Sequence, residues 1–437
     1  MLTKDAVHYY SIIRDKFKNS YLAEDANQII IGIDCDYIDS HEYSYKTLEL
    51  FYNNQKTIAP FAGLFGIFSY DTIHFFEKIE KKEKSQFEFP QFVFANAKAY
   101  LHYSKISKMY TFYGDEEKYY NFLENESFTE KPAENEFFYK IETDLDKEKE
   151  HFYDIVEKAK EYIKMGDIFQ VVLSEQLYLE SNIDSLEFYK KLAKANPSPY
   201  MFHFPTKYGD VVGSSPEILA EILFNNIYIA PIAGTRPRGK DANEDAFLAQ
   251  DLLNDPKECA EHRMLVDLAR NDIGKFARQG SVIVKNMMHV KHYQHVMHIV
   301  SEVFGQKRND VSLFDIISSV FPAGTLSGAP KIRAMEIIGE LEEYKRNIYG
   351  GGIGFLHFNG NMQLAIVIRS AFFANRNNAS DNISGKNTSE GNNVSKVFIQ
   401  AGAGIVYDSI KEKEYEEITH KRASVLNIFK NNCKERG

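Results

Sequence analysis

The sequence predicts an α+β fold, and three observations support this prediction. Strand-like segments follow one another directly in several places, helical spacing is confined to separate stretches, and no segment repeats at a fixed period. A regular alternation of strands and helices would indicate a parallel sheet instead. At roughly 100–200 residues per domain, the 437 residues allow one large unit or two to three ordinary domains.

The first part of the chain, residues 1–144, is rich in aromatic residues and contains no motif with a recognisable chemistry. Short apolar runs separated by polar turns predict strands at Gln28–Ile33, Leu64–Tyr70 and Gln91–His102. The pattern changes near Leu145, so we divide the chain into two regions, 1–144 and 145–437.

The second region combines helical and strand-like patterns. Apolar residues recur at helical spacing after Lys147, and this stretch ends at Gly166. Helices are expected at Lys147–Met165, Asn243–Leu253, Lys257–Arg270, Pro330–Leu341 and Lys411–Phe429. Strands are expected at Ile168–Leu179, Asp210–Ile232 (around an Asn225–Asn226 turn), Ser281–Val290, His295–Phe304, Met362–Ala374 and Val394–Val406. Residues 375–393 are polar and rich in Gly, Ser and Asn, which predicts a flexible hairpin insertion.

Composition excludes several classes of protein. The chain has 52 basic and 62 acidic side chains, a net charge of −10, and no long Lys/Arg run, which argues against a nucleic-acid partner. No stretch approaches the roughly 18 apolar residues of a membrane helix, and the N-terminus lacks a secretory signal pattern. The three cysteines, Cys35, Cys259 and Cys433, lack metal-like spacing, so we expect a reduced, cytoplasmic protein.

Two pairs of glutamates are candidate metal ligands. Glu258 and Glu261 share one helical face, as do Glu414, Glu417 and Lys421 in the last helix. Taken separately, the first pair is explained by a solvated acidic face and the second set by an ordinary Glu–Lys ion pair. Together the four carboxylates suit Mg²⁺, a hard cation that prefers oxygen ligands.

Three Gly-rich loops and two polar residues in apolar strands are further candidates. The loops PAGTLSGAP (322–330), YGGGIG (349–354) and QAGAGIV (400–406) match neither a P-loop nor a dinucleotide fingerprint. Their amides could hold a carboxylate, or they are simply tight turns. Arg369 lies inside an apolar strand pattern and needs a carboxylate partner, from the protein or from a substrate. His298, taken alone, is better explained as a buried, satisfied histidine.

These motifs, in this order, resemble the chorismate-utilising family, which contains anthranilate synthase component I, aminodeoxychorismate synthase component I and the isochorismate and salicylate synthases. The resemblance covers about the last 290 residues. It rests on GDIFQVVLS (166–174), SSPEIL (214–219), PIAGTRPRG (231–239), KECAEHRMLVDLARNDIG (257–274), HVMHIVS (295–301), FPAGTLSGAPKIRAMEII (321–338), IRS (368–370), EKEYEEITHKRA (412–423) and the last two Gly-rich loops. It implies a large α/β sandwich, with two antiparallel sheets packed on each other and helices outside, and a catalytic role for 145–437.

The resemblance also implies roles for individual residues. Glu261 and Glu417 would bind Mg²⁺ directly, and Glu258 and Glu414 would hold it through water. Chorismate would be bound by Tyr349, Arg369, Gly402, Ala403, Gly404 and Lys421. Glu217 would protonate the departing 4-hydroxyl, Thr235 and Thr325 would line the pocket, and His298 would take part in pyruvate elimination. A non-catalytic scaffold would have no reason to retain all of these groups.

Two positions separate the activities within the family. Isochorismate and salicylate synthases have a water-activating lysine where this chain has Gln170, and aminodeoxychorismate synthases typically have an attacking lysine where it has Ala233. Ammonia is then the expected nucleophile, with anthranilate and pyruvate as products. Aminodeoxychorismate synthase component I remains the alternative. No cysteine lies in a G-x-C-x-G motif, so a separate glutamine amidotransferase subunit (anthranilate synthase component II) is the expected partner.

A regulatory tryptophan site is expected where residues 1–144 meet the second region. Family members that respond to L-tryptophan share an L-L-E-S segment, here Leu22–Asp25, and N-P-S-P-Y-M, here Asn196–Met201. The predicted effector residues are Glu24, Asp25, Pro199, Tyr200 and Met201. Asp25 replaces the expected Ser, so its charge and length differ, although it can still accept a hydrogen bond. The absence of Trp from the chain agrees with a tryptophan-pathway enzyme or with a biased composition.

Overall fold

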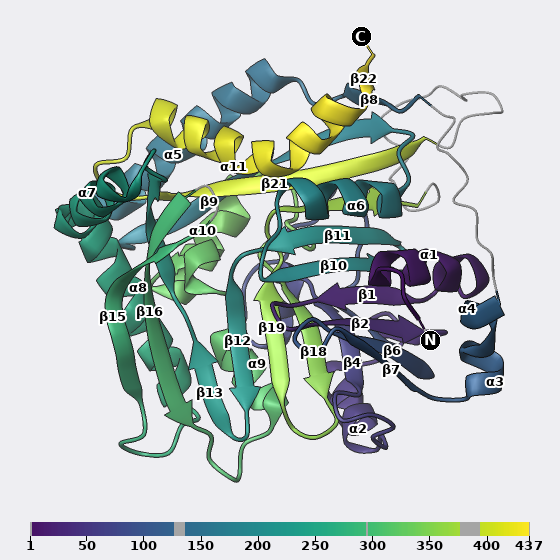
Figure 1. Ribbon diagram of the computed structural model, residues 1–437. Coiled ribbons are helices and arrows are strands. Elements are labelled where there is room, and N and C mark those ends of the chain that lie inside the picture. The colour runs from purple at the N-terminus through teal and green to yellow at the C-terminus, as the bar shows by residue number, and fades with distance from the viewer. Residues whose placement is uncertain (1, 126–135, 294–295, 376–393, 437) are drawn as a thin grey trace.

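The computed structural model describes residues 2–125, 136–293, 296–375 and 394–436. Two large sheets pack against each other, and the long helices lie on the outside (Figure 1). The expected α+β sandwich is therefore confirmed. Among the described strands, every neighbouring pair is antiparallel except β22 and β8.

The first sheet has twelve strands and contains the longest pairing in the molecule, between β9 and β21. Its strands, in order across the sheet, are β22 (Lys434–Glu435), β8 (Phe138–Ile141), β9 (Gln170–Ser181), β21 (Ser395–Ile405), β20 (Ser370–Ala374), β11 (Gly209–Ser215), β10 (Tyr200–Pro205), β1 (Tyr21–Glu24), β2 (Gln28–Ile33), β6 (Ala99–Ser104) and β7 (Met109–Tyr113), with β17 (Gly328–Ala329) paired to β9.

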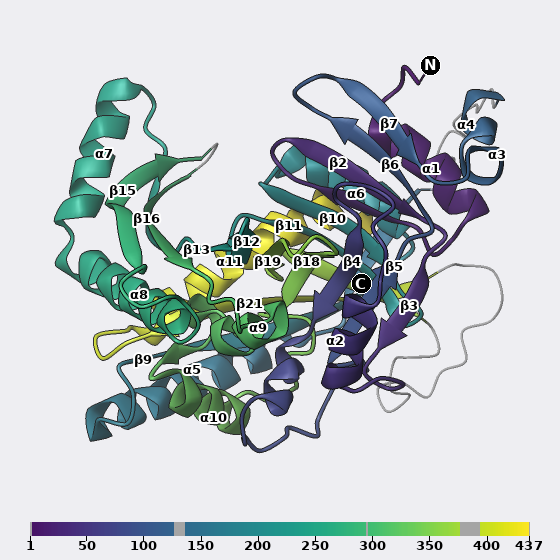
Figure 2. The same cartoon turned by 90° about the horizontal axis from the view of Figure 1, so that it is seen from below.

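The second sheet has ten strands. In order they are β14 (Ile232–Pro237), β16 (Val296–Gln306), β13 (Asn226–Ile229), β12 (Ile218–Leu223), β19 (Met362–Ile366), β18 (Gly352–His357), β4 (Gly63–Phe68), β5 (Phe92–Asn96) and β3 (Asp36–Asp39), with β15 (Ile283–His292) paired to β16. The β14–β16 end of this sheet and the β6–β7 end of the first lie on opposite sides of the molecule (Figure 2).

Capping residues mark the ends of several helices. Gly166 ends α5 in the left-handed conformation, with φ +83°, and Asp255 caps α8 by accepting hydrogen bonds from its first turn. The helices are α1 (Ala6–Lys16), α2 (Tyr45–Asn53), α3 (Glu116–Tyr119), α4 (Asn121–Asn125), α5 (Leu145–Met165), α6 (Ser185–Ala195), α7 (Ala242–Asn254), α8 (Pro256–Gly274), α9 (Leu313–Val320), α10 (Lys331–Leu341) and α11 (Lys411–Asn432), with short 3₁₀ turns η1 (Tyr70–Phe75) and η2 (Gly324–Leu326).

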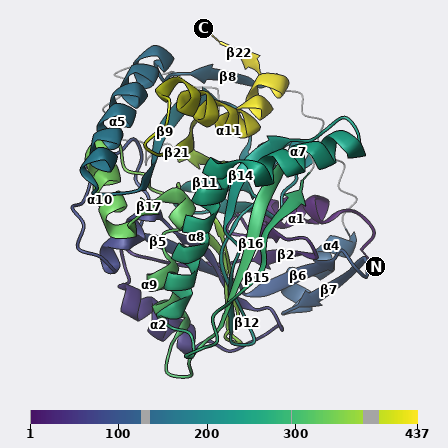
Figure 3. The same cartoon turned by 90° about the vertical axis from the view of Figure 1, so that its left-hand side faces the viewer.

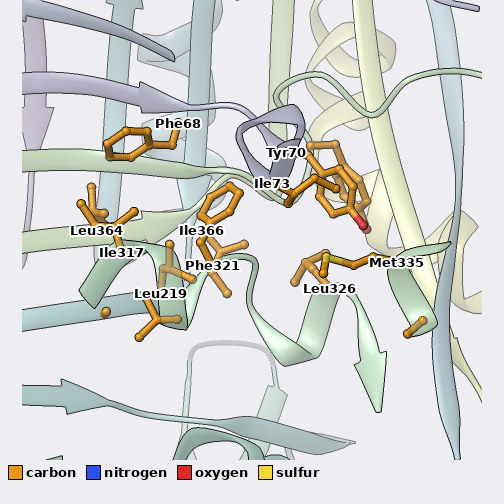
Figure 4. Close-up of a cluster of buried hydrophobic side chains, with 14 of the residues drawn as sticks. Phe68, Tyr70, Ile73, Leu219, Ile317, Phe321, Leu326, Met335, Leu364 and Ile366 are labelled. Carbon is orange, nitrogen blue, oxygen red and sulfur yellow. The ribbon is translucent and has the colours of Figure 1, made fainter. Parts of the chain in front are cut away.

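The core accounts for the aromatic content of the first region. Tyr21 and Phe65 stack at 4.4 Å between the two sheets, and Phe204 lies edge-on to Phe65 at 5.3 Å. Another cluster packs strands of the second sheet against α9, α10, η1 and η2; it includes Leu219, Phe321 and Leu326 (Figure 4). Burial of apolar side chains of this size is the main driving force for folding.

Residues from the two sequence regions share both sheets. β1 pairs with β10, and β4 pairs with β18. The division at residue 144 is therefore not a division between sheets, and the separate roles of 1–144 and 145–437 stay a prediction about function. None of the helices within the described ranges combines the length and the apolar composition that crossing a bilayer requires.

The elements differ from the sequence prediction at several places, among them Asp210–Ile232, which forms three strands, β11, β12 and β13, instead of two. Gln91–His102 forms two strands, β5 and β6, and the turn between β12 and β13 is formed by Phe224 and Asn225, both with positive φ, rather than by Asn225–Asn226. Met362–Ala374 also forms two strands, β19 and β20. The predicted hairpin insertion, 375–393, lies outside the described residues apart from Asn375.

The break between β19 and β20 is a point where the chain passes from one sheet to the other. The chain also passes between the sheets at the break between β11 and β12. Backbone hydrogen bonds join the two breaks: Ile366 N donates to Glu217 O (2.9 Å), and Ser214 N donates to Arg369 O (3.2 Å). The interpretation of Arg369 as the middle of a strand is therefore wrong. It lies at the crossing with φ +50°, a conformation that few non-glycine residues adopt.

Candidate active site

Glu217 lies at the crossing between β11 and β12 and is partly buried. Thr325, on η2, donates a hydrogen bond from Oγ1 to Glu217 Oε1 at 2.8 Å. Burial raises the pKa of Glu217 to about 7, against the lowering effects of Thr325, Lys421 and Arg369. A carboxyl group that titrates near neutral pH can hold a proton and release it to a leaving group, which is what a general acid requires.

Arg369 faces the same space from the other crossing strand. Burial lowers the pKa of its guanidinium, while the charge of Glu217 and the hydroxyl of Tyr293 raise it. Within the described residues, its side chain makes no ion pair and no hydrogen bond with a carboxylate. A partly buried guanidinium is costly without a planar anionic partner, so Arg369 is ready to accept a carboxylate from a ligand.

The glycines of β21 allow other groups to approach this strand closely. A Cβ on Gly402 would lie 2.9 Å from the Tyr349 hydroxyl, and one on Gly404 would lie 2.5 Å from Gln170 Nε2. Lys421 donates from Nζ to Gly402 O at 2.9 Å. Side chains at these two positions would therefore displace Tyr349 and Gln170, and the structure brings the predicted substrate residues of β21, α11 and the Tyr349 loop together.

The four predicted metal ligands come from the N-terminal parts of α8 and α11, which Figure 3 shows from the side of these helices. Burial raises the pKa of Glu258, Glu261 and Glu414. A neighbouring carboxylate raises each pKa further: Glu261 acts on Glu258, and Glu417 acts on Glu261 and Glu414. The effect of Glu417 on Glu261 connects α11 with α8, and a cation between these two carboxylates would relieve their repulsion.

The carboxylates are held by other partners in this structure. Glu261 accepts a hydrogen bond from Gln170 Nε2 at 2.9 Å, and Glu417 pairs with Lys421 at 2.7 Å. Within the described ranges, no three His, Cys, Asp or Glu side chains already stand close enough together to form a metal-binding group. The donor set fits Mg²⁺ in kind, since all four donors are carboxylates, and a bound ion would require Glu261 and Glu417 to turn from these partners.

His298 lies opposite Thr235 in the β14–β16 pairing. Its Nδ1 is 2.9 Å from Gly234 O and 3.1 Å from Thr235 Oγ1. A carbonyl only accepts, so Nδ1 carries the proton and Nε2 is left with its lone pair. Burial lowers the pKa of His298, which keeps the ring neutral at pH 7.

Tyr293 is a residue of the site that sequence reasoning missed. Its ring lies edge-on to His298 with centroids 5.5 Å apart, and burial and the charge of Glu217 raise its pKa. It directly follows β15, where a single aromatic residue produces no periodic pattern. Only the three-dimensional contact with His298 could reveal it.

The predicted effector segments lie side by side, with Glu24 opposite Met201 in the β1–β10 pairing. Glu24, Asp25, Tyr200 and Met201 line a cavity of about 30 Å³ between the sheets, whereas Pro199, which precedes β10, does not line it. The Glu24 carboxylate accepts hydrogen bonds from Lys105 and Tyr189. These contacts and the size of the cavity mean that a ligand as large as an amino acid would have to open it.

Asp25 stabilises a turn, a role that the sequence did not predict. Its Oδ1 accepts from the backbone N of Asn27 (2.7 Å) and of Gln28 (3.0 Å), and its Oδ2 accepts from Gln28 Nε2 (3.0 Å). Asp25 thus caps the turn between β1 and β2, so a ligand would compete with this turn for the carboxylate.

Comparison with known proteins identifies the family. A family model described as chorismate binding enzyme matches residues 9–427. Anthranilate synthase component 1 of Aquifex aeolicus is 49% identical over 280 residues, covering 64% of this chain and 52% of that protein. The enzyme of the same name from Methanothermobacter marburgensis is 40% identical over 383 residues, covering 87% of this chain and 78% of that protein. The chain thus spans about half the length of the first of these relatives.

Solved structures agree with this result. Anthranilate synthase component I from Streptococcus pneumoniae superimposes with a TM-score of 0.73 at 31% identity, covering 93% of this chain and 91% of that one. The menaquinone-specific isochorismate synthase from Escherichia coli, at 17% identity and a TM-score of 0.75, shares the fold. With a family model that matches residues 9–427, the chain belongs to the family of chorismate binding enzymes.

Proposed function

We propose that this chain converts chorismate and ammonia to anthranilate and pyruvate. The observation that carries the proposal is the pairing of Arg369, a partly buried cation without a carboxylate partner among the described residues, with Glu217, whose pKa lies at about 7. A dicarboxylate substrate with a hydroxyl leaving group uses both: Arg369 binds the enolpyruvyl carboxylate, and Glu217 faces the hydroxyl.

In the proposed reaction, the nitrogen of ammonia forms a bond to the ring as the bond to the 4-hydroxyl breaks. Hydroxide is a poor leaving group, so protonated Glu217 gives its proton to this oxygen and water departs. The ring carbon that bears the nitrogen then loses its hydrogen as a proton, and we assign the lone pair of His298 Nε2 as its acceptor. The C–O bond to the enolpyruvyl group breaks at the same time, the ring becomes aromatic, and the released enolpyruvate takes up a proton on carbon to become pyruvate. Tyr349 is buried beside Gly402 and orients the substrate together with Arg369.

We further propose that Mg²⁺ is the cofactor, with Glu261 and Glu417 as ligands and Glu258 and Glu414 supporting it through water. Their mutual effects on pKa support this assignment. When bound, Mg²⁺ supplies positive charge beside the ring carboxylate. Lys421, which already donates to Gly402 O, adds a second positive charge there.

Product identification separates the proposal from aminodeoxychorismate synthase component I, the alternative. Ala233 is buried in β14 and Gln170 is bound to Glu261, so this chain has neither an attacking amine at the first position nor a water-activating amine at the second. With chorismate, Mg²⁺ and ammonium, we expect chromatography to show anthranilate and pyruvate in equal amounts. Accumulation of 4-amino-4-deoxychorismate without pyruvate would favour the alternative.

We propose a glutamine amidotransferase subunit as the partner and the cytoplasm as the location. Burial raises the pKa of the Cys35 thiol, and it raises that of Cys433 to about 11, so neither is a ready thiolate nucleophile. Cys259 is also buried, and its Sγ contacts Leu253 O.

We expect this chain to make anthranilate with ammonium alone and to use glutamine only when an amidotransferase is added. The assay compares both nitrogen sources, with ammonium removed enzymatically from the glutamine reactions. Glutamine-dependent synthesis by the purified chain under those conditions would show that it hydrolyses glutamine itself.

We also propose that L-tryptophan binds where β1 meets β10 and inhibits the reaction. Because Asp25 lines this cavity, we expect Asp25→Ala to raise the tryptophan concentration for half-inhibition by about fivefold or more while changing kcat less. Asp36→Ala, which removes an exposed carboxylate of β3 outside the cavity, is the control. Unfolding temperatures of both variants show whether loss of the turn cap affects the fold. A rate unchanged by millimolar tryptophan, with no heat of binding, would exclude the site.

A further inference from the structure

A buried ion pair outside the predicted site connects several of its parts. Arg346 and Glu342 are 2% and 3% exposed, and they follow directly after α10. Arg346 Nε and Nη2 donate to the two oxygens of Glu342 at 2.8 and 2.6 Å. The pair is bidentate and fully enclosed, so its geometry is fixed more closely than that of a surface ion pair.

The rest of the guanidinium binds two backbone carbonyls. Arg346 Nη1 donates to Leu326 O at 2.6 Å, and Nη2 donates to Val172 O at 2.8 Å. Glu342 Oε1 in turn accepts from the backbone N and the hydroxyl of Ser174, at 2.9 and 2.7 Å. Arg346 and Glu342 therefore tie η2 to β9 through charged groups.

The hydrogen bond from Arg346 to η2 is made next to Thr325, the partner of Glu217. Leu326 is the residue after Thr325, whose hydroxyl donates to Glu217 at 2.8 Å. The Leu326 side chain is anchored in the apolar cluster beside Met335 (Figure 4), and its carbonyl is anchored by Arg346. Because the side chain and the carbonyl of Leu326 are both held, the neighbouring Thr325 hydroxyl has little freedom to move away from Glu217.

Only an arginine can make this set of contacts. Its planar fork reaches a carboxylate bidentately and two carbonyls at the same time, whereas a lysine has one nitrogen at the end of a flexible chain. The guanidinium carbon also lies 4.8 Å from the ring centre of Tyr70 and 5.6 Å from that of Tyr349. Arg346 thus contacts a predicted substrate residue as well as η2.

We propose that Arg346 is a positioning residue for the reaction: by holding the Leu326 carbonyl, it keeps the Thr325 hydroxyl hydrogen-bonded to Glu217. This inference rests on the proposed role of Glu217 as the general acid. The polar groups that interact with Glu217 are those of Thr325, Arg369, Lys421 and Tyr293. Of these four, Arg346 positions only Thr325.

The test compares pH profiles of kcat for Arg346→Lys, Thr325→Val and the double variant, with ammonium as the nitrogen source. The Thr325 hydrogen bond favours the charged carboxylate, so its loss raises the pKa of Glu217 and moves the high-pH decline of kcat upward. We expect a shift of about one pH unit and a fall in kcat of about tenfold in each single variant, with KM for chorismate changed less. The double variant should show no further shift.

The matched control is Arg333→Lys. Arg333 is on α10, the helix that precedes the ion pair, and its partners Asp167 and Glu336 are not part of η2, so the pH profile of this variant should match that of the wild type. If Arg346→Lys does not fold, Arg346→Gln/Glu342→Gln replaces it, because this neutral pair leaves no buried charge without a partner.

The outcomes are distinct. A wild-type pH profile in the Arg346 variant, or additive shifts in the double variant, would overturn the positioning role. If Thr325→Val shifts nothing either, the general acid is not Glu217, and the proposed mechanism fails rather than the role of Arg346 alone. Absence of anthranilate from the wild type would reject the proposed function itself.

Discussion

Replacing Glu217 with Gln should lower kcat by about 10²–10⁴-fold while the protein remains folded, which is the contribution expected of a positioned general acid. Gln has a similar shape and can still accept the Thr325 hydrogen bond, but its amide is too weak an acid to protonate the departing hydroxyl. In the wild type, the acid form is lost as pH rises through the pKa of about 7, so activity should decline toward high pH. That decline should disappear in the residual activity of Glu217→Gln.

The control for this variant is Glu221→Gln, on the adjoining strand β12. Burial also raises the pKa of Glu221, but this residue makes no contact with Thr325 or Arg369. Its kcat should stay within about twofold of the wild type. Near-normal turnover in Glu217→Gln would remove Glu217 from the mechanism.

Glu261→Gln and Glu417→Gln should each reduce kcat below detection without unfolding the protein. Each change removes a negative charge that the proposed Mg²⁺ site requires. The protein should stay folded, because the change also removes repulsion between neighbouring carboxylates. The pKa effects of Glu417 on Glu261 and Glu414 indicate that these groups share one space. The exposed Glu416, on another face of α11, provides the control Glu416→Gln.

Binding of Mg²⁺ is measured separately from activity, by calorimetry and by the rise in unfolding temperature with added Mg²⁺. We expect binding by the wild type and by Glu416→Gln, and none by the other two variants. Full activity in excess EDTA, or equal Mg²⁺ binding by all four proteins, would reject the metal assignment.

Local patterns predicted the parts of the site that lie on single helices. The spacing of Glu258 and Glu261 and the capping at Gly166 depend on residues within one or two turns, which a sequence displays directly. The sheet crossing at Arg369 was missed because an apolar run looks the same in one strand as in two strands of different sheets. The family motifs nevertheless supplied Arg369 as a site residue.

Contacts between distant segments could not be predicted in this way. Arg346 is one charged residue in a polar stretch, EEYKRN, and its partners Leu326 and Val172 are 20 and 174 residues away. The family resemblance likewise predicts that Asp25 contacts the effector, whereas in the structure its carboxylate caps a turn. Such roles depend on which strands become neighbours, and strand pairing leaves no local signature.

The proposed function requires that this chain alone converts chorismate and ammonia to anthranilate. The most direct measurement is the appearance of anthranilate fluorescence when the purified protein is mixed with chorismate, Mg²⁺ and ammonium, compared with the same mixture containing Glu217→Gln. We expect a steady rise in fluorescence with the wild type and almost none with the variant. No anthranilate from the folded wild-type protein, or equal rates for the two proteins, would contradict this account.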